Sequence, residues 1–239
     1  PTEVLLVCSR DLLAPTLKRM SMFVMRAKAK LSDASEEFLL YALAGSAIEK
    51  IAGSAIQTSA KAAFGNISVI GLAPAGAVAR ALWIAPVGTP APAGALLPEG
   101  LWAWGEVQSG VATLTAPLVD AFVPQMLNYE SVDGVSFKKG CYPGQEVVAR
   151  SQFRGAIKRR AFIAHADGPL QAGDEVFSAA EPEQACGVVA QAAPAPEGGW
   201  DAIVVLQLAA AESGALNAGS AGGPALYLGT LPYTLKEDL

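Results

Sequence analysis

From Ala161 onward the sequence consists of short apolar runs separated by turns rich in Gly, Pro and Asp. Strands are expected at residues 161–164, 175–177, 187–191, 200–208 and 225–227. This spacing is typical of a small antiparallel barrel, because short strands joined by tight turns pair with their neighbours and can close on themselves. The sequence therefore predicts a C-terminal β-barrel domain over residues 161–239.

Residues 1–160 instead alternate helical and strand patterns. Strands are expected at 4–8, 26–31, 38–44, 67–70 and 78–84, and helices at about 9–22 and 46–63. The order strand, helix, strand, strand, helix, strand is that of a ferredoxin-like unit. Proline and glycine residues between 86 and 100 exclude regular structure and predict a surface linker there. The predicted class is α+β, with the barrel as a second domain.

The composition indicates a folded protein with a real core. The chain has 239 residues, 52% of them hydrophobic, which is enough for two domains. No apolar run approaches the roughly 20 residues that span a bilayer, so no membrane contact is expected. Three cysteines without CxxC spacing argue against disulfides and for a reducing compartment. With one histidine, His165, a self-contained metal site is not expected, and His165 is predicted to be structural.

Positive charge is gathered in two stretches, although the net charge is −5. The first contains Lys18, Arg19, Arg26, Lys28 and Lys30, and the second contains Lys138, Lys139, Arg150, Arg154, Lys158, Arg159 and Arg160. If both fold onto one face, they form a basic patch suited to a polyanion such as RNA or to an acidic partner. Two ordinary solvated faces are the alternative.

One segment combines a thiol, a flexible backbone and dense charge. Its central octapeptide is Lys139-Gly140-Cys141-Tyr142-Pro143-Gly144-Gln145-Glu146. The glycines and the proline predict a tight turn, and a helix should open at Gln145. Cys141 would then lie just ahead of a helix N-terminus, where the helix dipole and Lys139 favour the thiolate. A nucleophile, a redox centre or a metal ligand is conceivable, and a small buried residue in a glycine turn is the alternative.

The octapeptide, with Arg150 four residues after it, resembles the signature of the YgfZ family. These proteins are folate-binding relatives of the glycine cleavage T-protein, implicated in iron-sulfur protein maintenance and tRNA modification. Two more segments match the family: residues 122–128, with a Pro-Gln-X-X-Asn element, and residues 231–235. The resemblance implies a T-protein type folate-binding domain over residues 1–160, followed by the barrel. Because members carry more sequence upstream and the chain does not begin with Met, an N-terminal truncation is expected.

The resemblance assigns roles to the residues of the octapeptide. Cys141 would be the reactive centre, and Lys139 would tune its charge state. The turn and the pocket wall would be shaped by Gly140, Tyr142, Gly144, Gln145, Glu146 and Arg150. Arg150 would either hydrogen-bond carbonyl groups or pair with Glu146 at the helical i, i+4 spacing.

The segment around Trp102 is expected to contact the cofactor, tetrahydrofolate or a derivative. The resemblance places an aromatic residue against folate here, and Trp102 falls at that position. A flat aromatic face suits a pterin ring. The alternative is that Trp102 and Trp104 both belong to the core. Gln108, Ser109 and Gly110 match the family poorly. Gln125 or Asn128 of the Pro-Gln-X-X-Asn element could bind a ligand amide or cap the turn, and the structural role is expected.

The leading functional hypothesis is a cytoplasmic accessory protein that binds folate and supports assembly or repair of iron-sulfur enzymes and, through them, tRNA modification. A eukaryotic source would place it in the mitochondrial matrix instead. Its partners would be folate and iron-sulfur assembly or client proteins, with RNA contact indirect rather than direct. The second hypothesis is a tetrahydrofolate-dependent aminomethyltransferase of the T-protein type. The third is a binding module that docks RNA or a protein scaffold through the basic patch.

Overall fold

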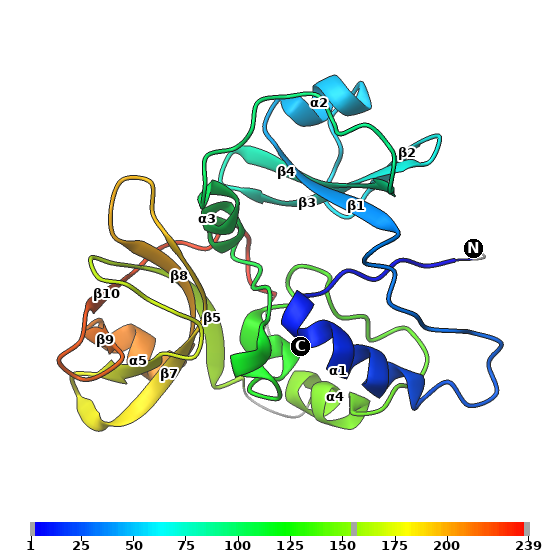
Figure 1. Cartoon of the computed structure of the whole chain (residues 1–239). Coiled ribbons are helices and arrows are strands. Elements are labelled where there is room, and N and C mark those ends of the chain that lie inside the picture. Colours follow the sequence, from blue (N-terminus) through cyan, green and yellow to red (C-terminus); the bar gives the residue numbers. More distant parts are fainter. Residues whose placement is uncertain (1–2, 154–156, 237–239) are drawn as a thin grey trace. The chain divides into compact units, whose positions relative to one another are not determined.

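The computed structural model describes residues 3–153 and 157–236. The chain forms two compact units (Figure 1). The first unit comprises residues 1–73 and 78–95, and the second comprises residues 74–77 and 96–239. The linker expected near residues 86–100 lies around this division, and residues 87–100 contain no helix or strand.

The first unit is built on a four-stranded antiparallel sheet in the order β1-β4-β3-β2. The strands are β1 (Phe38–Ala44), β2 (Lys61–Phe64), β3 (Ile67–Ala75) and β4 (Val78–Pro86), and the helices are α1 (Arg10–Ser21) and α2 (Ala47–Ala52). The core of this unit surrounds the fully buried Trp83 and Val69. Tyr41 on β1 packs edge-on against its cross-strand partner Trp83, with 5.5 Å between the ring centroids.

Several elements expected in this part are confirmed and others are wrong. The helix at 9–22 and the strands at 38–44, 67–70 and 78–84 are present. Residues 4–8 and 26–31 form no strand, so β1 is an edge of the sheet within the described residues. The helix expected at 46–63 ends at residue 52, because Gly53 takes a left-handed conformation with φ +73° and closes it. Residues 61–64 pair with β3 instead, through a turn at Gly65.

The second unit contains a closed antiparallel barrel in the order β10-β5-β8-β7-β6-β9. Its strands are β5 (Arg159–Ala166), β6 (Glu175–Ser178), β7 (Glu181–Pro194), β8 (Trp200–Gln207), β9 (Leu216–Ala218) and β10 (Ala225–Leu228), with α5 (Leu208–Ser213) between β8 and β9. All five expected strands are present, and the short β9 was not anticipated. The predicted α+β class with a small antiparallel barrel is confirmed.

The described residues 96–153 add four short helices to this unit. They are α3 (Leu101–Gln108), the 3₁₀ helices η1 (Ala116–Leu118) and η2 (Pro124–Leu127), and α4 (Gln145–Phe153). Val107, Leu118 and Leu127 pack against Ile203 and Val205 of the barrel in one cluster. The boundary expected at residues 160–161 therefore falls inside a compact unit.

Strand β8 is buried on both sides. Ala202, Val204 and Leu206 belong to the cluster inside the barrel, whereas Ile203 and Val205 belong to the cluster under the short helices. Because successive side chains of a strand point to opposite faces, an unbroken apolar run serves both cores. Through this shared strand, the short helices α3, η1 and η2 pack against the barrel.

Candidate functional site

Cys141 lies in an exposed turn directly before α4. A Cβ added at Gly140 would meet nothing within 4 Å, so the turn is open on that side. Gly144 has φ +86°, a conformation that strongly favours glycine, just before the helix begins at Gln145. The expected arrangement of turn, thiol and helix is therefore present, and the alternative of a buried Cys141 is excluded by its exposure.

The turn closes on itself through Tyr142 and Gln145. The backbone N–H of Tyr142 donates to Oε1 of Gln145 at 3.2 Å, and the backbone N–H of Gln145 donates to the carbonyl oxygen of Tyr142 at 3.2 Å. This reciprocal pattern resembles a capping box, which satisfies amide groups at the start of a helix. Lys139 places its Nζ 4.7 Å from the centroid of the Tyr142 ring, in a cation–π contact. The turn thus brings Lys139, Tyr142 and Gln145 together beside Cys141.

Glu146 and Arg150 form an ion pair along the outer face of α4. Their side chains lie 2.8 Å apart and are 82% and 70% exposed. The expected i, i+4 pairing is confirmed, and its contribution to stability should be small because water screens it. Glu146 also lies in the first turn of α4, where a negative charge is favourable.

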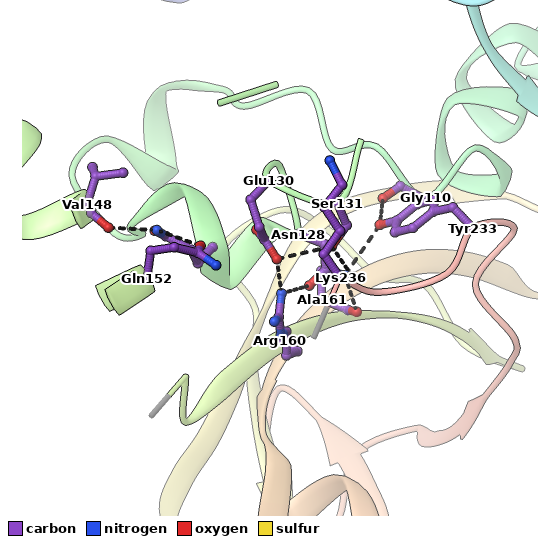
Figure 2. Close-up of polar contacts among 11 residues, drawn as sticks. Gly110, Asn128, Glu130, Ser131, Val148, Gln152, Arg160, Ala161, Tyr233 and Lys236 are labelled. Atoms are coloured by element: carbon purple, nitrogen blue, oxygen red, sulfur yellow. Dashed lines mark hydrogen bonds and ion pairs between the residues drawn. The ribbon is translucent and has the colours of Figure 1, made fainter. Parts of the chain in front are cut away.

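Helix α4 is hydrogen-bonded to Gln125, the glutamine of the Pro-Gln-X-X-Asn element. Gln125 is fully buried, and its Nε2 donates to the carbonyl oxygen of Val148 at 2.8 Å. A longer bond of 3.5 Å reaches Oε1 of Gln152 (Figure 2). Among the described residues, Oε1 of Gln125 has no hydrogen-bond partner. These bonds connect η2 to the helix that follows the Cys141 turn.

Asn128 ends η2 in a left-handed conformation, with φ +58°. Its Nδ2 donates to the carbonyl oxygen of Ala161 at 2.9 Å and to the hydroxyl of Tyr233 at 3.3 Å, and its Oδ1 accepts from Arg160 at 3.4 Å. These contacts connect η2 to the start of the barrel and to the C-terminal segment (Figure 2). The structural role expected for Gln125 and Asn128 is confirmed.

A buried ion pair between Glu130 and Arg160 completes this junction (Figure 2). The two side chains are 2% and 7% exposed, and Ser131 donates a further hydrogen bond to Glu130 at 3.1 Å. The hydroxyl of Tyr233 donates to the carbonyl oxygen of Gly110 at 2.8 Å. Burial raises the pKa of Tyr233, against a smaller opposing effect of its bond to Asn128. We name the set Gln125, Asn128, Glu130, Arg160 and Tyr233 the buried anchor.

Sequence reasoning did not select Glu130, Arg160 or Tyr233 as a group. Arg160 was counted among exposed positive charges, and that interpretation is wrong because its side chain is buried against Glu130. Tyr233 lies in the C-terminal segment that resembles the YgfZ family. The sequence therefore marked this segment, but it did not indicate that Tyr233 bonds to Asn128 and Gly110. Arg154 of the same basic stretch lies outside the described residues.

Helix α3 carries Trp102 and packs on the barrel through Trp104 and Gln108. Trp104 donates from Nε1 to Oδ2 of Asp201 at 2.7 Å, and Gln108 donates to the same oxygen at 2.8 Å. Nδ1 of His165 lies 2.7 Å from the other carboxylate oxygen of Asp201. His165 therefore helps to orient Asp201, in agreement with the structural role expected for it. Trp102 is half-buried in the first turn of α3, on a different element from Cys141.

The other two cysteines differ from Cys141 in different ways. Cys186 is buried on β7, and its Sγ lies 3.3 Å from the carbonyl oxygen of Val176. Burial raises the pKa of Cys186, so its thiolate is disfavoured. Cys8 is exposed in an irregular segment of the first unit. The described part of the chain contains no group of three or more His, Cys, Asp or Glu suited to a metal ion, and none of its helices could cross a membrane.

Comparison with known proteins identifies relatives of the chain. No family model matches it. The tRNA-modifying protein YgfZ of Cronobacter sakazakii is 35% identical over 141 residues, which are 57% of this chain and 43% of the relative. YgfZ of Serratia proteamaculans is 33% identical over 140 residues, which are 57% of this chain and 42% of the relative. The chain is a relative of YgfZ. The aligned part spans less than half the length of each of these two relatives.

A solved structure agrees with the YgfZ resemblance at the level of fold. The glycine cleavage system aminomethyltransferase T of Bartonella henselae matches with a TM-score of 0.53, over 93% of this chain and 66% of that structure. The sequences are 14% identical, so the match establishes the fold alone. The expected T-protein type architecture of this YgfZ relative is confirmed.

Proposed function

We propose that the chain belongs to a folate-binding accessory protein that supports assembly or repair of iron-sulfur enzymes and, through them, tRNA modification. The curated relatives are named tRNA-modifying proteins, and the fold is similar to that of a glycine cleavage system aminomethyltransferase T. The observation that supports this proposal most strongly is the exposed Cys141 turn. It precedes helix α4, which the buried Gln125 holds in place by a hydrogen bond. We further propose that this protein works in the cytoplasm and is non-enzymatic or weakly catalytic.

In this proposal Cys141 is the reactive centre. Its exposure makes the thiol accessible to a client protein, and it lies in the turn directly before α4. Lys139 adds positive charge to the turn and rests on the Tyr142 ring. Gly140 and Gly144 permit the turn, and Gln145 closes it.

Tetrahydrofolate is proposed to bind against α3. Trp102 is half-buried, and a flat aromatic face suits a pterin ring. Gln108, by contrast, commits its amide nitrogen to Asp201, which leaves less polar capacity for a ligand on that side. Helix α3 therefore offers folate an aromatic contact more readily than a polar one. When bound, the folate would supply one-carbon chemistry, while the protein residues bind and orient it.

Calorimetric titration with tetrahydrofolate in a reducing buffer tests the cofactor. Binding should weaken about fivefold or more in Trp102→Ala, because stacking contacts of one ring are worth about 1–3 kcal/mol. Trp102→Phe keeps an aromatic face and should bind nearly as the parent does. Equal affinity in the parent and in Trp102→Ala would remove Trp102 from the proposed site.

A tetrahydrofolate-dependent aminomethyltransferase of the T-protein type is the second candidate. The likeness of the fold to a solved aminomethyltransferase favours it. Transfer of an aminomethyl group to tetrahydrofolate by the purified chain would establish this activity. If the turnover were unaffected by Cys141→Ala, the reactive role proposed for Cys141 would be excluded as well.

A further inference from the structure

The cations of the two basic stretches of the sequence have different partners in the structure. In the second stretch Arg160 is buried against Glu130, and Arg150 pairs with Glu146. That part of the positive charge is neutralised within the protein. The two stretches also belong to different compact units, so the basic patch that would combine them stays a prediction.

The first stretch keeps its charge available. All five of its cations are exposed, and within residues 3–153 and 157–236 none of them forms an ion pair: Lys18, Arg19, Arg26, Lys28 and Lys30. No acidic residue occurs between positions 18 and 30, although the whole chain has a net charge of −5. A local concentration of unpaired positive charge on an acidic protein attracts a polyanion.

Exposed apolar side chains are interleaved with these cations. Met25 is 88% exposed and Phe23 is 49% exposed. The guanidinium carbon of Arg19 lies 5.6 Å from the centroid of the Phe23 ring, which gives a stacked cation and aromatic pair at the surface. Positive charge beside exposed aromatic rings is the combination that binds single-stranded nucleic acid, with cations on phosphates and rings on bases.

The shape of the backbone argues against a membrane surface as the partner. A helix that lies in the plane of a membrane presents one continuous apolar face to the lipid. Here α1 ends at Ser21, and Met22 to Leu31 form turns, bends and irregular chain. The apolar side chains therefore have no shared helical face, whereas an irregular basic segment can follow a flexible phosphate backbone.

We propose that residues 18–30 bind RNA, with Arg26, Lys28 and Lys30 on phosphates and Phe23 on an unstacked base. The inference rests on the proposed function in tRNA modification, and it replaces the indirect RNA contact expected from the sequence with direct contact at a defined segment. The partner is an RNA with single-stranded elements, such as the loops or the free end of a tRNA.

Fluorescence anisotropy of a labelled tRNA transcript, with the full chain and between about 50 and 200 mM salt, tests the proposal. Arg26→Glu with Lys28→Glu should weaken binding at least tenfold and reduce the slope of log K against log salt by about 1.5, since each phosphate contact contributes about 0.7 to 0.9. The matched control is Lys50→Glu with Lys61→Glu, two exposed lysines of the same unit with the same change of charge. It should retain most of the affinity.

Phe23→Ala supplies a second readout. Loss of one stacking contact should weaken binding about fivefold or more at every salt concentration and leave the salt slope unchanged. Equal loss in the two charge-reversed pairs, absence of salt-dependent tRNA binding, or binding only to vesicles of phosphatidylserine and phosphatidylcholine would each overturn the proposal. Tetrahydrofolate titration of the same variants separates the two ideas, because the charge changes should leave folate binding intact whichever result the tRNA gives.

Discussion

The Cys141 turn and the buried anchor belong to the same compact unit yet differ in almost every physical respect. The turn is exposed, and its contacts are local, with Tyr142 to Gln145 and Glu146 to Arg150 separated by three and four residues. The anchor is buried, and its contacts join residues far apart in sequence, such as Asn128 and Tyr233. Both segments resemble the same family, so a resemblance alone does not distinguish a support from a working surface.

This contrast teaches how the unit divides its tasks. Long-range buried hydrogen bonds stabilise a fold, because leaving any one of their partners unpaired is costly. An exposed turn adds little to stability, and it can therefore carry a reactive group without weakening the protein. Stability should reside in the anchor, and reactivity should reside in the turn.

The largest expected effect is loss of the buried ion pair. Arg160→Met should lower the free energy of unfolding by about 3–5 kcal/mol, because it leaves the Glu130 carboxylate buried without its cation. Urea titration followed by circular dichroism measures this loss. Arg159→Met, one residue earlier on the same strand and only half-buried, is the control and should cost about 1 kcal/mol or less. Similar losses in both would mean that the pair does not anchor this region.

Gln125→Met should have the next largest effect. The substitution keeps the volume of the side chain and removes the bond to the Val148 carbonyl, so a loss of about 1–3 kcal/mol is expected. Hydrogen exchange in α4 should accelerate as well. Gln145→Met, which removes only the local closure of the turn, should cost about 1 kcal/mol or less. If Gln145→Met were the more damaging change, the contrast between anchor and turn would be reversed.

Alkaline pH offers a test of Tyr233 in the anchor. Burial raises the pKa of Tyr233 above its value in the unfolded chain, so the native state holds this proton more tightly. Its contribution is present in full below the unfolded pKa, near 10, and is lost as pH rises through the folded pKa. Urea midpoints measured between about pH 8 and 11 should fall less steeply for Tyr233→Phe than for the parent. An identical slope would show that Tyr233 does not couple to folding.

The smallest expected change in stability is that of Cys141→Ala, within about 0.5 kcal/mol, because the side chain is exposed. The same variant should abolish complementation of an iron-sulfur maintenance defect. Alkylation followed by mass spectrometry should modify the exposed Cys141 much faster than the buried Cys186. Equal rates at Cys141 and Cys186 would end the case for an accessible, reactive thiol.

Local patterns in the sequence predicted local structure well. Short apolar runs between turns predicted the barrel strands, and the glycines around Cys141 predicted its turn and the start of α4. The same approach was wrong for residues 26–31, where alternating basic and apolar residues indicated a strand. A strand needs a partner elsewhere in the chain, and a two-residue period cannot show whether one is available.

The anchor shows why part of the site could not be predicted. Glu130 and Arg160 are 30 residues apart, and each looks like an ordinary surface charge when read alone. Only the fold brings them together in a place from which water is excluded. Gln125 and Asn128 could be selected because they occur as a motif, but their partners on α4 and at the start of β5 could not.

Strand β8 has a consequence for how the second unit comes apart. Its alternate residues are shared between the interior of the barrel and the cluster beneath α3, η1 and η2. Displacing β8 would expose both clusters to water at once, so neither cluster is expected to unfold alone. The helices α3, η1 and η2 and the barrel should therefore unfold in one cooperative transition.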